Sequence, residues 1–198
     1  PGRRPIRIAG ALLALAATTA IIVPVAWTAF AYLQRHRAFP TLVDFDSPVS
    51  EYFVRAYSAV TVERNQLPGS LASEAADVIG LHAVMTGNHG WGIALWEPYP
   101  DWRGYEHIAL DLANPADTPL WLQVHIRDQR QSHDRQRGYV GRIEVRPRSR
   151  QVHRIALKDL TGADGHARVD ISRVHSIVLR RDPGNRAPEF YLARIWIE

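Results

Sequence analysis

The sequence contains no cysteine, a single methionine and a single lysine, Lys158. The lack of cysteine excludes a disulfide-stapled scaffold, a zinc site with thiolate ligands and an enzyme with a thiol nucleophile. Also missing are a glycine-rich phosphate loop, a nucleophile-elbow pattern and a pair of histidines at helical metal spacing. We therefore expect no catalytic role, although Asp111, Asp128 and Glu144 are the kind of carboxylates that a general acid and base use.

The excess of positive charge is confined to one end of the chain. The sequence holds 24 basic and 20 acidic residues, but the domain-sized part over 38–198 has 19 basic and all 20 acidic residues, a net charge of −1. A nearly neutral domain has no general attraction for a polyphosphate, so we do not expect a nucleic-acid partner. The other five basic residues flank one apolar segment and are Arg3, Arg4, Arg7, Arg35 and Arg37.

That apolar segment covers residues 8–33 and contains no charge. A membrane-spanning helix needs about 20 such residues to cross a hydrocarbon core of about 30 Å. Pro24 is tolerated in a span, and Trp27 and Tyr32 lie near one end, where interfacial aromatic residues are typical. The segment predicts a transmembrane helix that binds the chain to a lipid bilayer. The alternative, a buried helix of a soluble core, is rarely this long without a charge.

A cleaved signal peptide is the other alternative, because arginines precede the segment and Ala29-Phe30-Ala31 is a small-residue pattern. The apolar region of a signal peptide runs over about 7–15 residues, so we favour an uncleaved anchor. Three arginines precede the span, whereas two arginines and His36 follow it, which places the N-terminus in the cytoplasm. We interpret the chain as a single-pass protein of a bacterial inner membrane. Its expected parts are a cytoplasmic N-terminus over 1–7, a transmembrane helix over 8–33, a tether over 34–40 and a periplasmic domain over 41–198.

From residue 41 onward apolar and polar residues alternate, which is typical of strands with one buried face. In the segment 120–128, Leu120, Leu122, Val124 and Ile126 fall on one face. Turn-forming pairs such as Asn114-Pro115 separate the strands, and residues 68–76 have room for one helical turn. This pattern predicts an all-β fold, an antiparallel β-sandwich preceded by one transmembrane α-helix. The expected strands are 42–45, 52–64, 78–86, 91–96, 107–113, 120–128, 139–146, 152–157, 175–180 and 189–197.

The polar face of the segment 120–128 is the candidate binding surface. It carries an aromatic ring, an amide, an imidazole and a guanidinium, and we expect two polar residues of a neighbouring strand beside them. Sugars bind to such mixtures, because a flat ring stacks on C–H groups while planar polar groups pair with hydroxyls. The alternative is that the face is polar only because water covers it. The predicted ligand-binding residues are Trp121, Gln123, His125, Arg127, His107 and Asp111.

A second candidate surface follows from charge polarity within the domain. Residues 127–154 carry a net charge of +6, whereas residues 38–126 carry −8. The two regions either neutralise each other across the sandwich or leave arginines free to dock an acidic protein surface or lipid headgroups, because guanidinium groups bind carboxylates and phosphates in pairs of hydrogen bonds. The predicted docking residues are Arg142, Arg146, Arg148 and Arg150.

Several strand-and-turn motifs resemble the jelly roll of carbohydrate-binding modules, within the galactose-binding-like group. The motifs are VDFD (43–46), WRGY (102–105), IALDLANP (108–115), LQVHIRD (122–128), VHRIALKDL (152–160), VDISRV (169–174) and FYLARI (190–195). Similar domains are attached to some VanZ-like bacterial membrane proteins. The resemblance implies an antiparallel jelly-roll β-sandwich and a glycan ligand.

The resemblance also implies a structural calcium, to which the family's last strand commonly contributes an acidic residue. Ala193 occupies that place in this sequence, and Asp44 and Asp46 are the remaining candidate ligands. Calcium needs six to eight oxygen ligands, which this chain does not supply in any recognisable pattern. We therefore expect no metal and no other cofactor.

Two functions remain open at this point. In the first, the domain is a non-catalytic, membrane-anchored module that binds a glycan through the face of residues 121–127. In the second, it is an accessory subunit that stabilises a larger respiratory or photosynthetic membrane complex, with the sandwich as the docking body. The resemblance favours the first function, whereas Ala193, the charge polarity and the anchor favour the second.

Overall fold

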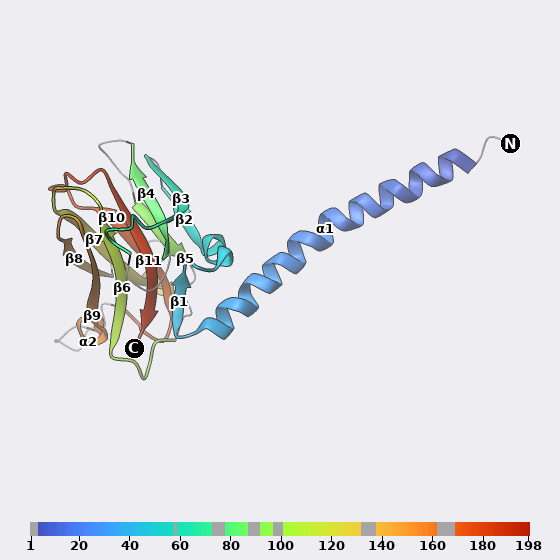
Figure 1. The fold of residues 1–198 in the computed structure, drawn as a ribbon. Coiled ribbons are helices and arrows are strands. Elements are labelled where there is room, and N and C mark those ends of the chain that lie inside the picture. Colours follow the sequence, from blue (N-terminus) through green and yellow to red (C-terminus); the bar gives the residue numbers. More distant parts are fainter. Residues whose placement is uncertain are drawn as a thin grey trace. The chain divides into compact units, whose positions relative to one another are not determined.

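The computed structural model describes residues 4–57, 59–72, 78–86, 92–96, 101–131, 138–161 and 169–198, with the helix side chains from residue 12 onward. The chain forms two units, Pro1–Arg37 and Ala38–Glu198. The first unit is a helix and the second is a domain built from antiparallel strands (Figure 1).

The helix α1 has 35 residues over Arg4–Ala38 and contains Pro24. Its segment Leu12–Ala38 is long and apolar enough to cross a membrane, and no residue in the most apolar 18-residue stretch of this segment is buried. The hydroxyls of Thr18 and Thr28 donate to helix carbonyls four residues earlier, at 2.8 and 2.9 Å. These hydroxyls are therefore satisfied within the helix, as a hydrocarbon environment requires.

Six strands form the first sheet, sheet A, in the order β3-β4-β11-β6-β9 with β1 added to β11. Every pair in this sheet is antiparallel. The strands of sheet A are β1 (Thr41–Asp44), β3 (Val60–Gln66), β4 (Ile79–Met85), β6 (His107–Asn114), β9 (Ser149–Ala156) and β11 (Glu189–Ile197).

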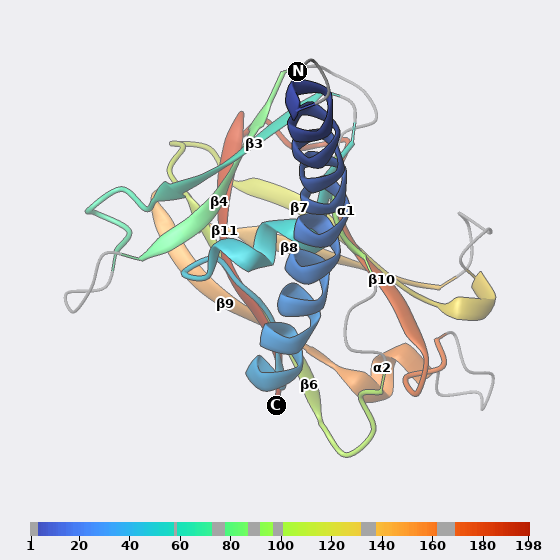
Figure 2. The same cartoon turned by 90° about the vertical axis from the view of Figure 1, so that its right-hand side faces the viewer.

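Five strands form the second sheet, sheet B, in the order β2-β5-β10-β7-β8, again antiparallel throughout. They are β2 (Val54–Ala56), β5 (Gly92–Trp96), β7 (Leu120–Asp128), β8 (Tyr139–Val145) and β10 (Val174–Arg181). The short helices of the domain are η1 (Pro48–Phe53), η2 (Gln129–Gln131) and α2 (Leu157–Thr161). The last of these begins beside the start of β6, where Leu157 N donates to Glu106 O at 2.8 Å (Figure 2).

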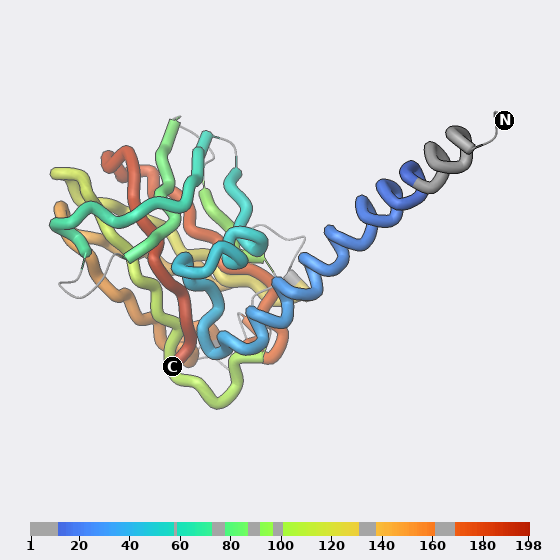
Figure 3. The backbone as a smooth tube through the Cα atoms, turned by 45° about the vertical axis from the view of Figure 1, so that its right-hand side comes forward, coloured from blue at the N-terminus to red at the C-terminus, as the bar shows by residue number. Residues whose placement is uncertain are grey.

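The strand β11 joins parts of sheet A that lie far apart in the chain. One edge of β11 pairs with β6, with a register shift between Leu192 and Arg194. The other edge pairs with β4 up to Leu192 and with β1 from Arg194 onward. At this shift the carbonyl of Ala193 accepts a hydrogen bond from Phe45 N at 3.2 Å. The first and last strands of the domain therefore lie side by side (Figure 3).

The two sheets bury the side chains that the alternation assigns to the core. In β7, Leu120, Leu122, Val124 and Ile126 are all fully buried, and Ile108, Leu110 and Leu112 of β6 are buried in the same way. Each such side chain stabilises the fold by about 1.5–3 kcal/mol relative to an exposed one. The predicted antiparallel sandwich and its core are thus confirmed. Trp102 is also fully buried.

Some predicted boundaries differ from the structure. The predicted strand 52–64 is divided into part of η1, β2 and β3, and the chain turns at Ala59, whose φ is +67°. No glycine or proline lies at this turn, so turn-forming residues in the sequence do not predict it. The predicted tether over 34–40 is helical as far as Ala38. Trp91 and the second half of the predicted helical turn, 73–76, lie outside the described residues, and 68–72 forms turns instead.

Asn114 connects the two sheets at the end of β6. Its side chain is fully buried, and Nδ2 donates to the carbonyls of Thr118, Val145 and Arg146 at 2.9, 3.1 and 3.2 Å. Its Oδ1 accepts from Ala116 N at 3.0 Å. The amide of Asn114 thereby holds the turn after β6 against the end of β8. The Asn-Pro pair, which the sequence predicts only as a turn, therefore also links the two sheets.

We predict that Asn114→Ala lowers the free energy of unfolding by about 2–3 kcal/mol, because it leaves buried carbonyl groups without donors. The measurement is urea unfolding of the full chain in detergent, followed by tryptophan fluorescence. Asn65→Ala is the matched control, because Asn65 is exposed and makes one hydrogen bond, to Glu63. Its expected loss is within about 0.5 kcal/mol. Equal losses in the two variants would show that the amide does not hold the sheets together.

Candidate functional site

The polar residues of β7 lie together on the outer face of sheet B, as predicted. Trp121, Gln123 and Arg127 are partly exposed, and His125 is 8% exposed. Their orientation is a direct result of the buried alternate residues, because successive side chains of a strand point to opposite faces. The row from the first to the last of these residues extends about 20 Å along the strand.

Strand pairing determines which other side chains share this surface. Gln123 lies opposite Arg180 on β10 and Arg142 on β8, and His125 lies opposite Val178 and Val140. Paired residues point to the same side of a sheet. The surface, which we call the sheet B face, consists of Arg55, Ala94, Trp96, Trp121, Gln123, His125, Arg127, Val140, Arg142, Glu144, Ser176, Val178 and Arg180.

Trp121 stacks against a cation within this face. The guanidinium of Arg142 lies 4.0 Å from the ring centroid of Trp121, a cation–π distance. Arg142 Nε is also 3.1 Å from Asp182 Oδ2, and the same oxygen lies 3.4 Å from Gln123 Nε2. A buried carboxylate at the end of β10 therefore orients both planar groups next to the ring.

His125 is neutral in this surface. Burial lowers its pKa to about 4, and the positive charges of Arg180 and Arg127 contribute to the same shift. Its Nε2 lies 3.3 Å from Gln123 Oε1, so the ring donates to the amide in the tautomer protonated at Nε2. The imidazole can exchange hydrogen bonds with hydroxyl groups without adding charge.

Trp96 adds a second aromatic ring at the other end of the sheet B face. It pairs with Ser176, which in turn pairs with Arg127 at the end of β7 away from Trp121. The ring of His175 lies edge-on to it, with centroids 5.3 Å apart. The face thus carries aromatic rings at two ends and the planar polar groups of β7 between them, whereas Ala94, Ser176 and Val178 beside Trp96 are buried.

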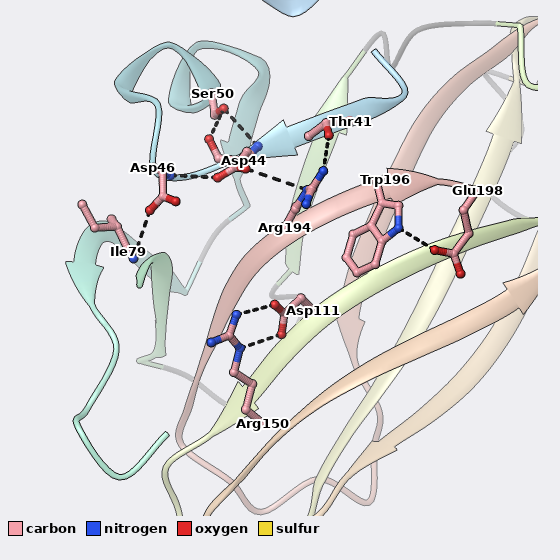
Figure 4. Close-up of polar contacts among 10 residues, drawn as sticks. All are labelled: Thr41, Asp44, Asp46, Ser50, Ile79, Asp111, Arg150, Arg194, Trp196 and Glu198. Carbon is pink, nitrogen blue, oxygen red and sulfur yellow. Dashed lines mark hydrogen bonds and ion pairs between the residues drawn. The ribbon is translucent and has the colours of Figure 1, made fainter. Parts of the chain in front are cut away.

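The structure corrects the expected position of His107 and Asp111. Both lie on β6, which pairs with β9 and β11 in sheet A, so they do not lie beside the polar row of β7. The alternation of β6 is as predicted, but alternation does not specify which strands pair. Asp111 is instead bound by Arg150, whose Nε and terminal nitrogen donate to its two oxygens at 2.9 and 2.6 Å (Figure 4).

The four predicted docking arginines do not form one surface. Arg142 lies on the sheet B face, and Arg150 lies on the outer face of sheet A. Three of the four have carboxylate partners within the domain: Arg142 pairs with Asp182, Arg148 with Asp117 and Arg150 with Asp111. Arg146 is exposed at the end of β8. Two of these pairs, Arg148 with Asp117 and Arg150 with Asp111, join the oppositely charged regions 38–126 and 127–154, whereas Asp182 lies outside both regions.

The two candidate calcium ligands are held by other contacts. Asp46 Oδ1 accepts from Ile79 N at 3.3 Å, and Asp44 Oδ2 lies 3.8 Å from Arg194 Nε (Figure 4). Arg64 donates to the carbonyls of Phe45 and Asp46, at 2.6 and 3.0 Å. These residues do not fit a calcium site, because a guanidinium already occupies the carbonyl oxygens between them. Among the described residues, no three His, Asp or Glu side chains cluster at metal-binding distance.

The residues that neighbouring strands add to the sheet B face are not predicted as site residues by the sequence, apart from Arg142, and Arg180 is the most important of them. The signal for Arg180 is present, because it has the parity of Ser176 and Val178 in a predicted strand. The pairing of β10 with β7 is what local pattern does not provide. Asp182 beside the face is likewise not predicted, because in the sequence it is part of a turn.

Comparison with known proteins bears on the fold of the domain. No protein-family model and no curated protein sequence matches the chain. Among solved structures, an exo-beta-agarase matches with a TM-score of 0.62 and 15% identity, over 80% of this chain and 24% of that chain. The chain therefore spans about a quarter of the length of that enzyme.

Two binding modules match over almost their whole length. One is a family 11 carbohydrate-binding module from Clostridium thermocellum, in complex with a beta-1,3-1,4-mixed-linked tetrasaccharide, with a TM-score of 0.54 and 17% identity over 79% of this chain and 93% of that chain. The other is the CBM22-1 xylan-binding domain from Paenibacillus barcinonensis Xyn10C, with a TM-score of 0.52 and 13% identity over 80% of this chain and 93% of that chain. The domain thus has the jelly-roll β-sandwich fold of these carbohydrate-binding modules and is preceded by an apolar helix.

We predict that His125 makes the domain less stable in mild acid. Because its pKa in the folded chain is below the ordinary 6.5, the unfolded chain binds more protons between these two values, and the free energy of unfolding falls as the pH is lowered. Between about pH 7 and about pH 5, His125 should lower the free energy of unfolding by about 2 kcal/mol, and His125→Asn should remove this loss. Urea unfolding of both proteins at the two pH values measures it. An equal loss in the variant, or an imidazole that titrates near 6.5 by NMR, would contradict the prediction.

Proposed function

We propose that this chain is a non-catalytic, membrane-anchored binding module that holds a glycan on the sheet B face. The observation that carries the proposal is the composition of that face: Trp121 and Trp96 lie at its ends, and Gln123, neutral His125 and arginines lie between them. The jelly-roll fold supports it, since structural neighbours include a module in complex with a tetrasaccharide and a xylan-binding domain.

The chemistry of the face suits a polymeric sugar. A tryptophan ring stacks on the C–H face of a pyranose, and amide or guanidinium groups pair with two adjacent hydroxyls. Asp182 holds Arg142 and Gln123 in fixed orientations before a ligand arrives, so less side-chain freedom is lost on binding. Trp121, Gln123 and Arg127 reach solvent on this face, whereas Ser176 and Val178 of the adjoining β10 are 1% and 4% exposed, so a ligand would contact the β7 and β8 part of the face.

A role without catalysis is supported by the extent of the match. The chain corresponds to nearly the full length of two binding modules and to about a quarter of an agarase. A glycosidase needs two carboxyl groups at defined separation on either side of the bond that it cleaves. On the sheet B face, Asp182 is already engaged by Arg142 and Gln123.

The helix α1 would fasten this module to a membrane. Apolar side chains such as Leu13, Ile21 and Val25 are more than half exposed on it, and water does not favour a contiguous apolar surface of this kind. Arginines at its two ends suit the bilayer interfaces. With the greater number of arginines before the span, the sandwich would face the periplasm.

We predict that Trp121→Ala weakens binding of a polysaccharide at least about tenfold, because truncation of a tryptophan that contacts a ligand commonly costs about 2 kcal/mol or more. The full chain is reconstituted in nanodiscs of uncharged lipid, without a sugar-based detergent, and its affinity for immobilised neutral and acidic polysaccharides is measured. Trp196→Ala is the matched control, because Trp196 is a half-buried tryptophan that pairs with Ala109 in sheet A. It should leave the affinity within about twofold.

No binding to any polysaccharide, or equal losses in the two variants, would refute the glycan-binding role. In that case a stoichiometric protein that co-purifies with the chain from native membranes in mild detergent would favour the accessory-subunit function instead.

We also predict that the mature protein keeps its apolar segment. Intact mass spectrometry of the chain purified from membranes should give a mass that includes residues 8–33, and alkaline carbonate should not extract it, because a spanning helix is held by the hydrophobic effect. A mass that corresponds to a chain beginning soon after Ala31 would instead identify the segment as a cleaved signal peptide.

A further inference from the structure

Charge on the sheet B face is unbalanced. Four arginines belong to the face or its edge, against two carboxylates, Glu144 within the face and Asp182 beside it. Asp182 is committed to Arg142. The arginines are Arg55, Arg127, Arg142 and Arg180.

Arg180 is the member of this set that stands out. It lies on β10, the central strand of sheet B, and is partly buried. In the part of the chain that the structure describes, no carboxylate lies within ion-pair distance of it. A guanidinium keeps its charge at every accessible pH, so Arg180 presents a permanent positive charge that none of the described carboxylates pairs with.

Several arginines outside the sheet B face are paired. Arg103, Arg148, Arg150 and Arg154 each have a carboxylate partner inside the chain. Within the described residues the fold supplies counter-charges to these arginines, but none to Arg180 at the centre of sheet B.

The neighbouring imidazole lies in the field of this charge. Burial is the main cause that lowers the pKa of His125, and the positive charges of Arg180 and Arg127 act in the same direction, which indicates a positive potential at the middle of the face. This potential is available to a ligand, because no carboxylate among the described residues forms an ion pair with Arg180.

We infer that the glycan bound by the sheet B face is an acidic polysaccharide, whose carboxylate or sulfate groups pair with the guanidinium of Arg180. This inference rests on the proposed function. The planar guanidinium matches a carboxylate or a sulfate with two parallel hydrogen bonds, while Trp121, Gln123 and His125 contact the ring and its hydroxyls. An uncharged polymer would leave the cation of Arg180 without a counter-ion under the ligand.

The test compares each acidic polymer with an uncharged counterpart of the same backbone. Polygalacturonate is compared with its fully methyl-esterified form for the carboxylate, and carrageenan is compared with its chemically desulfated form for the sulfate. The full chain in nanodiscs of uncharged lipid should bind the acidic member of at least one pair roughly tenfold more tightly. That preference should decrease between about 50 and about 300 mM salt, as ion pairing is screened. The pair that shows the preference identifies the acidic group.

Arg180→Gln should reduce the affinity for the acidic polymer roughly tenfold and change the affinity for its uncharged counterpart less than about twofold. Arg154→Gln is the matched control, because it removes the same charge from the outer face of sheet A and should not change either affinity. Arg180→Lys keeps the charge but loses the paired donors, so an intermediate loss is expected. Urea unfolding midpoints show whether each variant is folded. If Arg180→Gln does not fold, the affinities of Arg180→Lys are used for the test instead.

Two results would overturn the inference while leaving the glycan-binding role intact. The first is equal or tighter binding of the uncharged member of both pairs, with Trp121→Ala still weakening it. The second is an equal loss in Arg180→Gln and Arg154→Gln, which would mean that only overall charge matters. If no polymer binds, or Trp121→Ala has no effect on any of them, the proposed function itself fails, and this inference with it.

Discussion

The burial of four alternate side chains of β7 is the constraint on which the rest of the site depends. Leu120, Leu122, Val124 and Ile126 are fully enclosed between the sheets. The intervening residues therefore have no alternative to the outer surface. A shift of one residue in the register of β7 would place a guanidinium in the core and a row of aliphatic groups in water, at a cost of many kcal/mol.

The partners of β7 convert this row into a surface. β10 on one side and β8 on the other bring Arg180 and Arg142 level with Gln123. Asp182, which follows β10, then fixes two of these planar groups next to Trp121. The whole sheet B face is assembled from five strands, β2, β5, β7, β8 and β10, so no short motif describes it.

The sequence was sufficient to predict what depends on local pattern. The strands 120–128 and 189–197 begin and end at the predicted residues, and the sandwich and its core follow from alternation. What it could not provide is strand order, which results from packing between segments far apart in the chain. For this reason His107 and Asp111 were expected beside β7 although they belong to sheet A, and Arg180 was not expected there. The sequence does not predict the turn at Ala59, because this left-handed position is neither a glycine nor next to a proline.

The position of β11 determines when the domain can be completed during synthesis. This strand supplies the hydrogen-bonding partners of β1, β4 and β6, yet it is made after every other strand of both sheets. Until β11 is available, β3 and β4 have no connection to β6 and β9 within sheet A. Sheet B contains no residue of β11, so all its strands are made before the strand that completes the opposite layer, and the sandwich closes only when this last strand has been added.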